Sequence, residues 1–333
     1  MSLNVGLLGG GSWGTTVASV VARNTPVTLW ARDAETVRQV NQEHRNEKYL
    51  PDATLHESLR ASEDLAEVVA GADVLIMGVP SQGFRSVLES VKPHLRAWVP
   101  VISLTKGLEL DTRMRMTEII QEVLPGHPVG VLTGPNLARE IMSGQAAASV
   151  IAMEDQIIVQ QLQALFSSGL FRVYTNDDVI GCELGGVLKN IIAIAVGMGD
   201  GQGAGDNTRS ALITRGLAEV TRLGVALGGR AETFSGLAGM GDMIATCTSP
   251  QSRNRHVGME LGKGRHIDDV IAQMTMVAEG VKSAPAVMAL AESQAISMPI
   301  ASDVFEVVAG RRTARQAFRG LLRVLPGAES EPG

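Results

Sequence analysis

Asn4-Val-Gly-Leu-Leu-Gly-Gly-Gly-Ser-Trp-Gly14 joins a short apolar run to a cluster of glycines near the start of this 333-residue chain. The run Val5–Leu8 has the length and composition of a buried strand. A helical pattern follows from Ser12 to about Ala22. Between the two, the chain matches the pattern Gly-x-Gly-x-x-Gly, whose glycines are Gly9, Gly11 and Gly14.

Glycines at these positions serve a ligand as well as the fold. They permit a tight turn, let the backbone approach a pyrophosphate, and allow the helix to pack closely on the strand. The N terminus of the helix adds N–H groups and positive potential. Strand, turn and helix together predict a dinucleotide-binding site that includes Ser12 and Trp13. Trp13 either flanks the bound dinucleotide or packs against the protein.

Short apolar runs alternate with helical patterns up to about residue 170, as in βαβ units around a parallel sheet. Two late segments complete the sheet and frame a helix over Asp155–Ser167. We therefore expect an α/β domain at residues 1–180, with a Rossmann-like doubly wound sheet and ligands at the carboxyl ends of its strands. The expected strands are Val5–Leu8, Val27–Trp30, Val74–Val79, Val99–Leu104, Gly130–Thr133, Ala148–Met153 and Phe171–Thr175.

Strand-like alternation ends near Glu183, and long stretches rich in Ala, Leu, Met and Gly follow. This pattern predicts an all-helical C-terminal domain over residues 181–325. Two domains also suit the length, because single cores usually stop growing at about 250–300 residues. Residues 326–333 contain turn formers and acids without an apolar anchor, and we expect a disordered tail there.

The composition favours a globular, cytoplasmic protein. Hydrophobic residues make up 45% of the chain, and the net charge of −6 comes without a basic block, so no nucleic-acid partner is expected. No apolar run approaches the ~20 residues of a membrane span, and no export signal precedes the first strand. Cys182 and Cys247 are too few for a disulfide framework, which suits a reducing compartment. The six histidines are isolated, so no metal site is expected.

The end of the second expected strand bears on the choice of cofactor. An acidic side chain at this place binds the ribose 2′-hydroxyl of NAD, and an arginine binds the 2′-phosphate of NADP. The chain has Arg32 followed by Asp33. Arg32 favours NADP, whereas Asp33 leaves NAD open. The alternative for Arg32 is a solvated surface charge.

Two lysines stand in apolar or glycine-rich surroundings, where lysine is uncommon. Lys106 follows the strand Val99–Leu104, and Lys189 lies in a helical stretch without other basic residues. Oxidation of an alcohol requires removal of its proton as hydride leaves, and reduction returns that proton. Lys189 is the candidate for this step, with Lys106 as a neighbouring cation that would help to lower its pKa toward ~7–8. The alternative is that Lys189 extends from the helix to solvent.

Two later segments suit a phosphorylated alcohol. Asp242 closes the run Gly239-Met-Gly-Asp242 and would either orient the Lys189 ammonium or cap a helix. The segment Ser252-Arg-Asn-Arg255 combines hydroxyl, guanidinium and amide groups, a set that binds anions. An exposed loop can have the same composition.

Six segments of the chain form a recognisable series, namely Gly9–Gly14, Leu104–Gly107, Thr133–Ala138, Gly185–Asn190, Leu237–Asp242 and Ser252–Asn254. In this order they closely resemble the motifs of bacterial NAD(P)-dependent glycerol-3-phosphate dehydrogenases, and the match runs from about residue 4 to residue 320. The resemblance implies reduction of dihydroxyacetone phosphate to sn-glycerol 3-phosphate, the backbone precursor of phospholipids, in the cytoplasm. It also implies a homodimer.

The resemblance implies roles for individual residues. Lys189 would exchange the proton, with Lys106 and Asp242 as further catalytic residues, and the cofactor would be NADP or NAD, with NADP favoured. The implied substrate contacts are Lys106, Gly134, Asn136, Lys189, Asp242, Ser252, Arg253 and Asn254. The implied cofactor contacts are Gly9, Gly11, Ser12, Trp13, Gly14, Arg32, Lys106, Ala138, Arg253, Val277 and Glu279.

Two positions depart from the family pattern. Asn136 stands where the family often has serine, and Trp13 stands where phenylalanine is frequent. Both keep the type of chemistry, so activity is expected while substrate affinity and cofactor fit shift. Two other functions stay open: a dehydrogenase of the same architecture that acts on a hydroxy acid or acyl substrate, and a redox sensor that binds NADP(H) without turnover. The lysine pair argues against the sensor.

Overall fold

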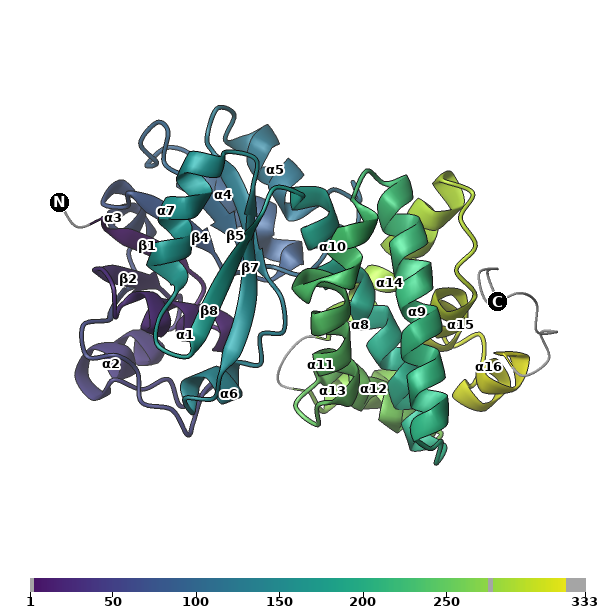
Figure 1. Cartoon of the computed structure of the whole chain (residues 1–333). Helices are drawn as coiled ribbons and strands as arrows, with labels where there is room; N and C mark the ends of the chain where they lie inside the picture. Colours follow the sequence, from purple (N-terminus) through teal and green to yellow (C-terminus); the bar gives the residue numbers. More distant parts are fainter. Residues whose placement is uncertain (1–2, 275–277, 322–333) are drawn as a thin grey trace. The chain divides into compact units, whose positions relative to one another are not determined.

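The chain divides into two compact units. In Figure 1 the colours follow the sequence, from purple at the N terminus to yellow at the C terminus. The computed structural model describes residues 3–274 and 278–321. The first unit contains Met1–Lys106 and Met114–Val179, and the second contains Gly107–Arg113 and Ile180–Gly333. The short segment Gly107–Arg113 belongs to the second unit because Leu108 is buried in its apolar core.

An eight-stranded sheet forms the centre of the first unit. The sheet order reverses between β1 and β4, which is the topology of a doubly wound fold, and the predicted fold class is confirmed. One strand, β3, was not expected, because its three residues are too few to show a periodic pattern. In sheet order the strands are β3 (Arg60–Ser62), β2 (Val27–Trp30), β1 (Val5–Leu8), β4 (Val74–Met77), β5 (Val101–Ser103), β6 (Val129–Thr133), β7 (Ala147–Met153) and β8 (Phe171–Asn176).

The sheet is parallel except between β6 and β7, where Leu132 lies opposite Ile151 in an antiparallel pair. The prediction of a parallel sheet is wrong at this pair. The only helix in the connection between the two strands is the five-residue α6 (Ala138–Met142), whereas a parallel crossover is usually made by a longer helix that runs back along the sheet. β8 returns parallel to β7 through the eleven-residue helix α7 (Gln156–Phe166).

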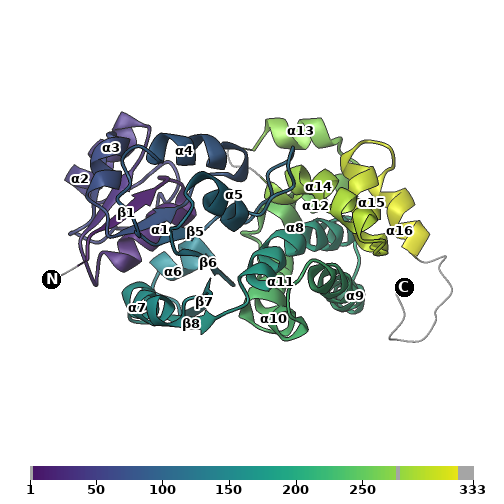
Figure 2. The ribbon, with the colours of Figure 1, turned by 90° about the horizontal axis from the view of Figure 1, so that it is seen from above.

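Helices cover both faces of this sheet. Figure 2 shows α3, α4 and α5 along one side of the strands and α7 along the other. Leu7 is buried in one core with residues of α1 and α7, and Leu8 is buried in the other with residues of α3, α4 and α5, because successive strand residues point to opposite faces. The remaining helices of this unit are α1 (Ser12–Val21), α2 (Ala34–Glu43), α3 (Leu65–Ala70), α4 (Phe84–Val91) and α5 (Met116–Val123), with a 3-10 turn at Ser81–Gly83.

The second unit is helical in its described part. The helix α8 (Val179–Gly201) lies at its centre, and every residue from Gly181 to Gly199 is buried. The other helices are α9 (Asp206–Ala226), α10 (Ala231–Ser235), α11 (Asp242–Thr248), α12 (Arg253–Gly262), α13 (Ile267–Ala272), α14 (Glu279–Ser293), α15 (Pro299–Val308) and α16 (Ala314–Leu321), with a π-helical turn at Leu237–Gly241. The predicted tail at 326–333 lies outside the described residues.

Burial explains the apolar composition of α8. Within the described ranges it is the one helix long and apolar enough to cross a membrane, yet 89% of its most apolar window is buried inside the protein. A core helix needs the same composition, since its side chains contact other helices on all sides. The composition of α8 is therefore accounted for by packing.

Glycines bring α8 and α12 into close contact. A Cβ atom at Gly197 would lie 2.1 Å from the carbonyl oxygen of Arg255, and one at Gly201 would also meet the backbone of α12. Gly258 and Gly262 meet the backbone of α8 in the same way, at 2.0 and 2.4 Å. Larger side chains would push the helices apart, so these four glycines set the spacing at which the side chains of α8 and α12 meet.

Candidate active site

The glycine turn of the first unit has the geometry of a phosphate cradle. Gly9 has a φ of 123°, and a Cβ atom at Gly14 would lie 2.1 Å from its carbonyl oxygen. A Cβ atom at Gly11 would meet nothing within 4 Å. Gly9 and Gly14 are thus required by the fold, whereas Gly11 faces open space. The helix α1 begins at Ser12 with no side chain capping its N terminus, which leaves N–H groups for an anion.

Asn46 supports this turn and was not predicted from the sequence. Its Nδ2 donates to the carbonyl oxygen of Gly10 at 2.9 Å and lies 2.8 Å from the hydroxyl of Thr15. The residue is fully buried. An asparagine thirty-odd residues beyond a motif has no local signal, so only the fold reveals this contact.

Trp13 lies in the glycine turn, and its side chain packs against the protein. Its ring meets the ring of Phe171 edge-on, with centroids 6.4 Å apart. Its Nε1 is buried without a hydrogen-bond partner among the described residues. A buried N–H of this kind is normally satisfied, so the indole has a donor available for a ligand at the turn.

Arg32 and Asp33, the two candidate contacts for the cofactor ribose, follow β2 and differ in their surroundings. Asp33 is already engaged, because its carboxylate accepts a hydrogen bond from Thr36 at 2.9 Å and lies 3.7 Å from the ammonium of Lys48. Arg32 is exposed, and in the described parts of the chain no ion pair of its side chain is present. The guanidinium of Arg32 is therefore the available group at this place.

Lys106 follows β5 and meets the loop after β6. Its Nζ donates to the carbonyl oxygen of Gly134 at 2.8 Å, so the structure brings together two residues that the motifs had singled out. Thr105 fixes the start of this loop by donating to the carbonyl oxygen of Val79 at 2.6 Å. Gly134 has a φ of 123°, which favours glycine. Lys106 is half-buried, so its ammonium can still reach a ligand.

Asn136 lies in the same loop with one side of its amide engaged. Its Oδ1 accepts a hydrogen bond from the buried hydroxyl of Ser149 on β7. Its Nδ2 is buried without a partner among the described residues, as is the hydroxyl of Thr133. Ser149 therefore holds the amide so that its donor side is available, a role the sequence did not indicate. Ala138, the predicted cofactor contact nearby, is the first residue of α6.

Lys189 lies on α8 and is only 5% exposed. Its Nζ lies 2.6 Å from Oδ1 of Asp242 and also donates to the hydroxyl of Thr246. The alternative that Lys189 extends to solvent is therefore wrong. A buried ammonium is stable only with such partners, since burial opposes its charge and a nearby carboxylate favours it. Lys106 belongs to the other unit, and its proximity to Lys189 stays a prediction.

Asp242 and Thr246, which both bond to Lys189, come from one short helix. Asp242 is the first residue of α11 and is 1% exposed. Gly241 occupies the N-cap position, so the alternative that Asp242 is the cap is wrong. Thr246, one turn later, donates to the carbonyl oxygen of Asp242 at 2.7 Å, which leaves a hydroxyl lone pair for Lys189. The spacing Asp-x-x-x-Thr is the sequence signal that could have revealed Thr246.

Cys247 borders this cluster and is inert. The thiol is fully buried, and burial raises its pKa to about 12. The nearby ammonium of Lys189 opposes the shift but does not reverse it. A protonated thiol cannot act as a nucleophile at neutral pH, so it serves as an apolar neighbour.

The predicted anion-binding segment begins α12. The hydroxyl of Ser252 caps the helix by accepting from the N–H of Arg255 at 3.2 Å, so the segment is an ordered helix start. Asn254 uses both sides of its amide, donating to Oδ1 of Asn190 at 3.0 Å and accepting from the N–H of Gly280 at 3.0 Å. These bonds link α8, α12 and α14.

Arg253, the first residue of α12, is exposed, yet protein atoms surround much of its guanidinium. Burial lowers its pKa, and the carboxylate of Glu279 at the start of α14 opposes this. Arginine keeps its charge at neutral pH in either case. Val277, a predicted cofactor contact next to Glu279, lies outside the described residues.

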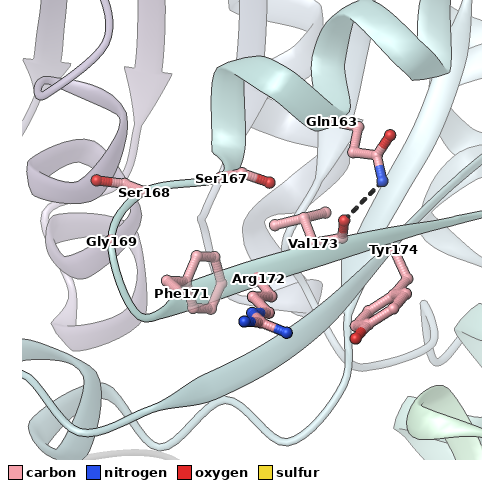
Figure 3. A pocket seen from close by; sticks show the side chains of 8 residues that line it. All are labelled: Gln163, Ser167, Ser168, Gly169, Phe171, Arg172, Val173 and Tyr174. Atoms are coloured by element: carbon pink, nitrogen blue, oxygen red, sulfur yellow. Dashed lines mark hydrogen bonds between the residues drawn. The ribbon is translucent and has the colours of Figure 1, made fainter.

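A surface hollow in the first unit is lined by none of the predicted site residues. It has a volume of about 350 Å³ and lies between the end of α7 and β8, as Figure 3 shows. Gln163 closes part of it by donating to the carbonyl oxygen of Val173 at 2.8 Å. Among described side chains, no three of His, Cys, Asp or Glu gather where they could hold a metal ion. The candidate functional groups lie instead at the glycine turn, after β2, around Lys106 and Asn136, around Lys189, and at the start of α12.

Two family profiles match almost the whole chain. The profile for the N terminus of NAD-dependent glycerol-3-phosphate dehydrogenase covers residues 4–159, and the profile for the C terminus covers residues 178–319. The chain belongs to this family. The resemblance expected from the six motifs is thereby confirmed.

Individual glycerol-3-phosphate dehydrogenases agree with this assignment. The glycerol-3-phosphate dehydrogenase [NAD(P)+] 2 of Sphingopyxis alaskensis is 73% identical over the full length of both chains. The glycerol-3-phosphate dehydrogenase [NAD(P)+] 1 of Mycobacterium tuberculosis is 56% identical, covering 97% of this chain and 95% of its own. A crystal structure of the Coxiella burnetii glycerol-3-phosphate dehydrogenase superposes with a TM-score of 0.92 at 38% identity, covering 97% and 99% of the two chains.

Proposed function

We propose that the chain uses NAD(P)H to reduce dihydroxyacetone phosphate to sn-glycerol 3-phosphate, with Lys189 as the residue that transfers the proton. The observation that carries this proposal is the buried ammonium of Lys189 between the carboxylate of Asp242 and the hydroxyl of Thr246. Such an ammonium is an acid held in one orientation. Reduction of a ketone to an alcohol needs an acid of this kind at the carbonyl oxygen.

The chain's own residues divide the work of the reduction. A reduced nicotinamide, when bound, supplies the hydride. Lys189 donates a proton from Nζ to the carbonyl oxygen, which becomes the hydroxyl of the product. Asp242 keeps the ammonium in place before the transfer, and Thr246 directs one of its N–H bonds. In the reverse direction the neutral amine takes the proton back from the alcohol.

The phosphate of the substrate needs cations and donors, and the proposed contacts supply both. Arg253 offers a planar fork of donors, and Lys106 offers a half-buried ammonium. The amide donor of Asn136 suits an oxygen of the substrate, since it is buried without another partner among the described residues. Gly134, Ser252 and Asn254 complete the proposed substrate site, Ser252 and Asn254 at the N terminus of α12, where N–H groups lack intrahelical partners.

The dinucleotide would lie along the glycine turn, with its pyrophosphate at the N terminus of α1. We propose NADP as the favoured cofactor, because Arg32 is exposed and Asp33 is occupied by Thr36 and Lys48. The proposed contacts are Gly9, Gly11, Ser12, Trp13, Gly14, Arg32, Lys106, Ala138, Arg253, Val277 and Glu279. The product would supply phospholipid synthesis in the cytoplasm, and the enzyme would act as a homodimer.

The test is an initial-rate assay with dihydroxyacetone phosphate and either NADPH or NADH, followed by the loss of absorbance of the reduced nicotinamide. Rapid consumption with a preference for NADPH is expected, and Arg32→Ala should shift the preference toward NADH. A 3-hydroxy acid assayed for oxidation serves as the control substrate. Turnover of the hydroxy acid alone would identify another dehydrogenase, and tight dinucleotide binding without any turnover would identify a sensor.

A further inference from the structure

Asp200 is the centre of a buried ion-pair network in the second unit. It is the second-to-last residue of α8, and its side chain is only 7% exposed. Arg255 of α12 donates to its Oδ2 from Nε at 2.7 Å, with a second guanidinium nitrogen also at 2.7 Å. Arg209 of α9 donates to its Oδ1 at 2.9 and 3.2 Å. One carboxylate therefore joins three helices.

The bond between Asp200 and Arg255 holds the first turn of α12, which also contains the proposed phosphate contact Arg253. Arg255 is the third residue of this helix, and Arg253 is the first. Arg255 therefore does not take part in the anion-binding group suggested by its place in the sequence. Its side chain is 17% exposed and directed to Asp200, whereas Arg253 is exposed. In this short segment one arginine binds Asp200, and the proposed function assigns the other to the substrate phosphate.

The ion pair supplies a constraint that the glycine contacts lack. The contacts at Gly197 and Gly258 set how closely α8 and α12 approach, whereas the Asn254–Asn190 hydrogen bond and the Arg255–Asp200 pair join the two helices at fixed points. Two nitrogens of the Arg255 guanidinium converge on one carboxylate oxygen of Asp200, and this charge-assisted contact fixes both distance and direction. Lys189 lies on α8 and Arg253 lies on α12, so the register of these helices sets the position of the proton donor relative to the phosphate contact.

We propose that Asp200 is a positioning residue for substrate phosphate: it holds Arg255, and through it the first turn of α12, in register with Lys189. This inference rests on the proposed function. Misplacement of a binding group by about 1 Å can cost up to about 100-fold in rate, so a loosened first turn should be measurable. The effect should fall on the phosphorylated substrate, because Asp200 bonds to Arg255 and Arg209, whereas Lys189 bonds to Asp242 and Thr246.

Arg209 provides a matched control. It binds the same carboxylate and also pairs with Asp206 at 2.5 Å, but it belongs to α9 and has no bond to α12. Removing Arg209 disturbs the charge of the network and the stability of the protein without releasing Arg255. A purely structural role of the network predicts that Arg209 and Arg255 matter equally, and a positioning role predicts that they do not.

The experiment compares Asp200→Asn, Arg255→Gln, Arg255→Lys and Arg209→Gln with the unmodified chain. KM and kcat are measured with dihydroxyacetone phosphate, kcat/KM is measured with unphosphorylated dihydroxyacetone, and the midpoint of thermal unfolding is recorded. Asp200→Asn and Arg255→Gln should raise KM for the phosphorylated ketone about 10-fold, with kcat changed less than about 2-fold and kcat/KM for dihydroxyacetone unchanged. Arg255→Lys should restore part of the loss, and Arg209→Gln should keep the original KM.

Distinct outcomes separate this inference from the proposed function. Absence of activity in the unmodified chain would contradict the proposed function itself. An active chain whose Asp200 and Arg255 variants lose activity equally on both ketones would overturn the positioning role, as would an Arg209→Gln variant with the same rise in KM. If Arg255→Gln fails to fold, Arg255→Lys replaces it, because lysine keeps a charged partner for Asp200. An unchanged KM in both single variants, Arg255→Lys and Asp200→Asn, would also overturn the positioning role.

Discussion

Lys106 and Lys189 show how two units of one chain use the same side chain differently. Lys106 stands in a loop at the end of a strand, is half-buried, and donates to a backbone carbonyl. Lys189 stands in the middle of a 23-residue helix, is almost fully buried, and donates to a carboxylate and a hydroxyl. The first keeps an ammonium that can turn to an arriving anion. The second keeps an ammonium in one direction, as a proton donor requires.

The difference follows from what each environment offers a charge. The carbonyl oxygen that accepts from Lys106 carries no formal charge, and the half-buried side chain can also reach water and a ligand. A buried carboxylate compensates the charge of Lys189, and removing either member would leave the other uncompensated in the interior. We therefore expect the variants of Lys106 to act on substrate affinity and those of Lys189 to act on the chemical step.

The largest expected effect is that of Lys189→Ala. Loss of a positioned acid–base group should lower kcat by roughly 10²–10⁴-fold, because the ammonium that Asp242 and Thr246 hold is removed. The measurement is single-substrate kinetics with dihydroxyacetone phosphate at saturating NADPH. Near-normal turnover would remove Lys189 from the proton transfer. Intact binding of NADPH by the variant serves as the control for folding.

Lys106→Ala should act mainly on binding. We expect KM for dihydroxyacetone phosphate to rise by about 10-fold or more, since a charge-assisted contact to phosphate is lost, with a smaller fall in kcat. The same kinetic assay separates the two parameters. Lys92→Ala, at the end of α4, is the control for loss of a surface charge in this unit. A fall in kcat as deep as that of Lys189→Ala would break the contrast between the two lysines.

Thr246→Val removes the hydroxyl and keeps nearly the same side-chain shape. Lys189 would lose one of its two described partners, and we expect kcat to fall by about 3–10-fold, the equivalent of about 1 kcal/mol for one hydrogen bond. Thr248→Val is the matched control, because Thr248 lies on the same helix and makes the same backbone bond, to Ile244 at 2.8 Å, without touching Lys189. Equal kinetics for the two variants would show that Thr246 only stabilises α11.

Glu219→Gln tests a second buried charge of the helical unit and should change stability alone. Burial raises the pKa of Glu219 to about 7, and the N–H groups of Ile300 and Ala301 oppose the shift. Between the ordinary pKa of 4.5 and about 7 the folded state binds more protons than the unfolded state. The free energy of unfolding therefore falls as pH rises through this window, by an amount on the order of 1–3 kcal/mol.

Glutamine does not titrate, so thermal unfolding of the variant should lose this pH dependence, while its single acceptor oxygen can replace only one of the two bonds from Ile300 and Ala301. Glu232→Gln, at an exposed position of α10, should keep the original profile. A Glu219→Gln variant with the original pH profile would show that another group causes it.

The sequence by itself determined the parts of the protein that depend on local pattern. Gly9 and Gly14 of the first turn are required by backbone approach distances of 2.5 and 2.1 Å, which no other residue tolerates, so the motif predicts this part of the geometry directly. Lys189 could be singled out because lysine is rare in an apolar helix. Most expected strands and the helical second unit follow from the period of the apolar residues.

Only the tertiary structure decided which side chains meet. Asn46 lies 36 residues from Gly10 and Ser149 lies 13 residues from Asn136, and no local pattern links these partners. Thr246 lies 57 residues from Lys189, although its spacing from Asp242 is local. The antiparallel direction of β7 and the pairing of Arg255 with Asp200, in place of a ligand, were likewise decided by the tertiary structure. A hydrogen bond between distant residues depends on how whole elements pack, and that packing is a property of all the buried surfaces together.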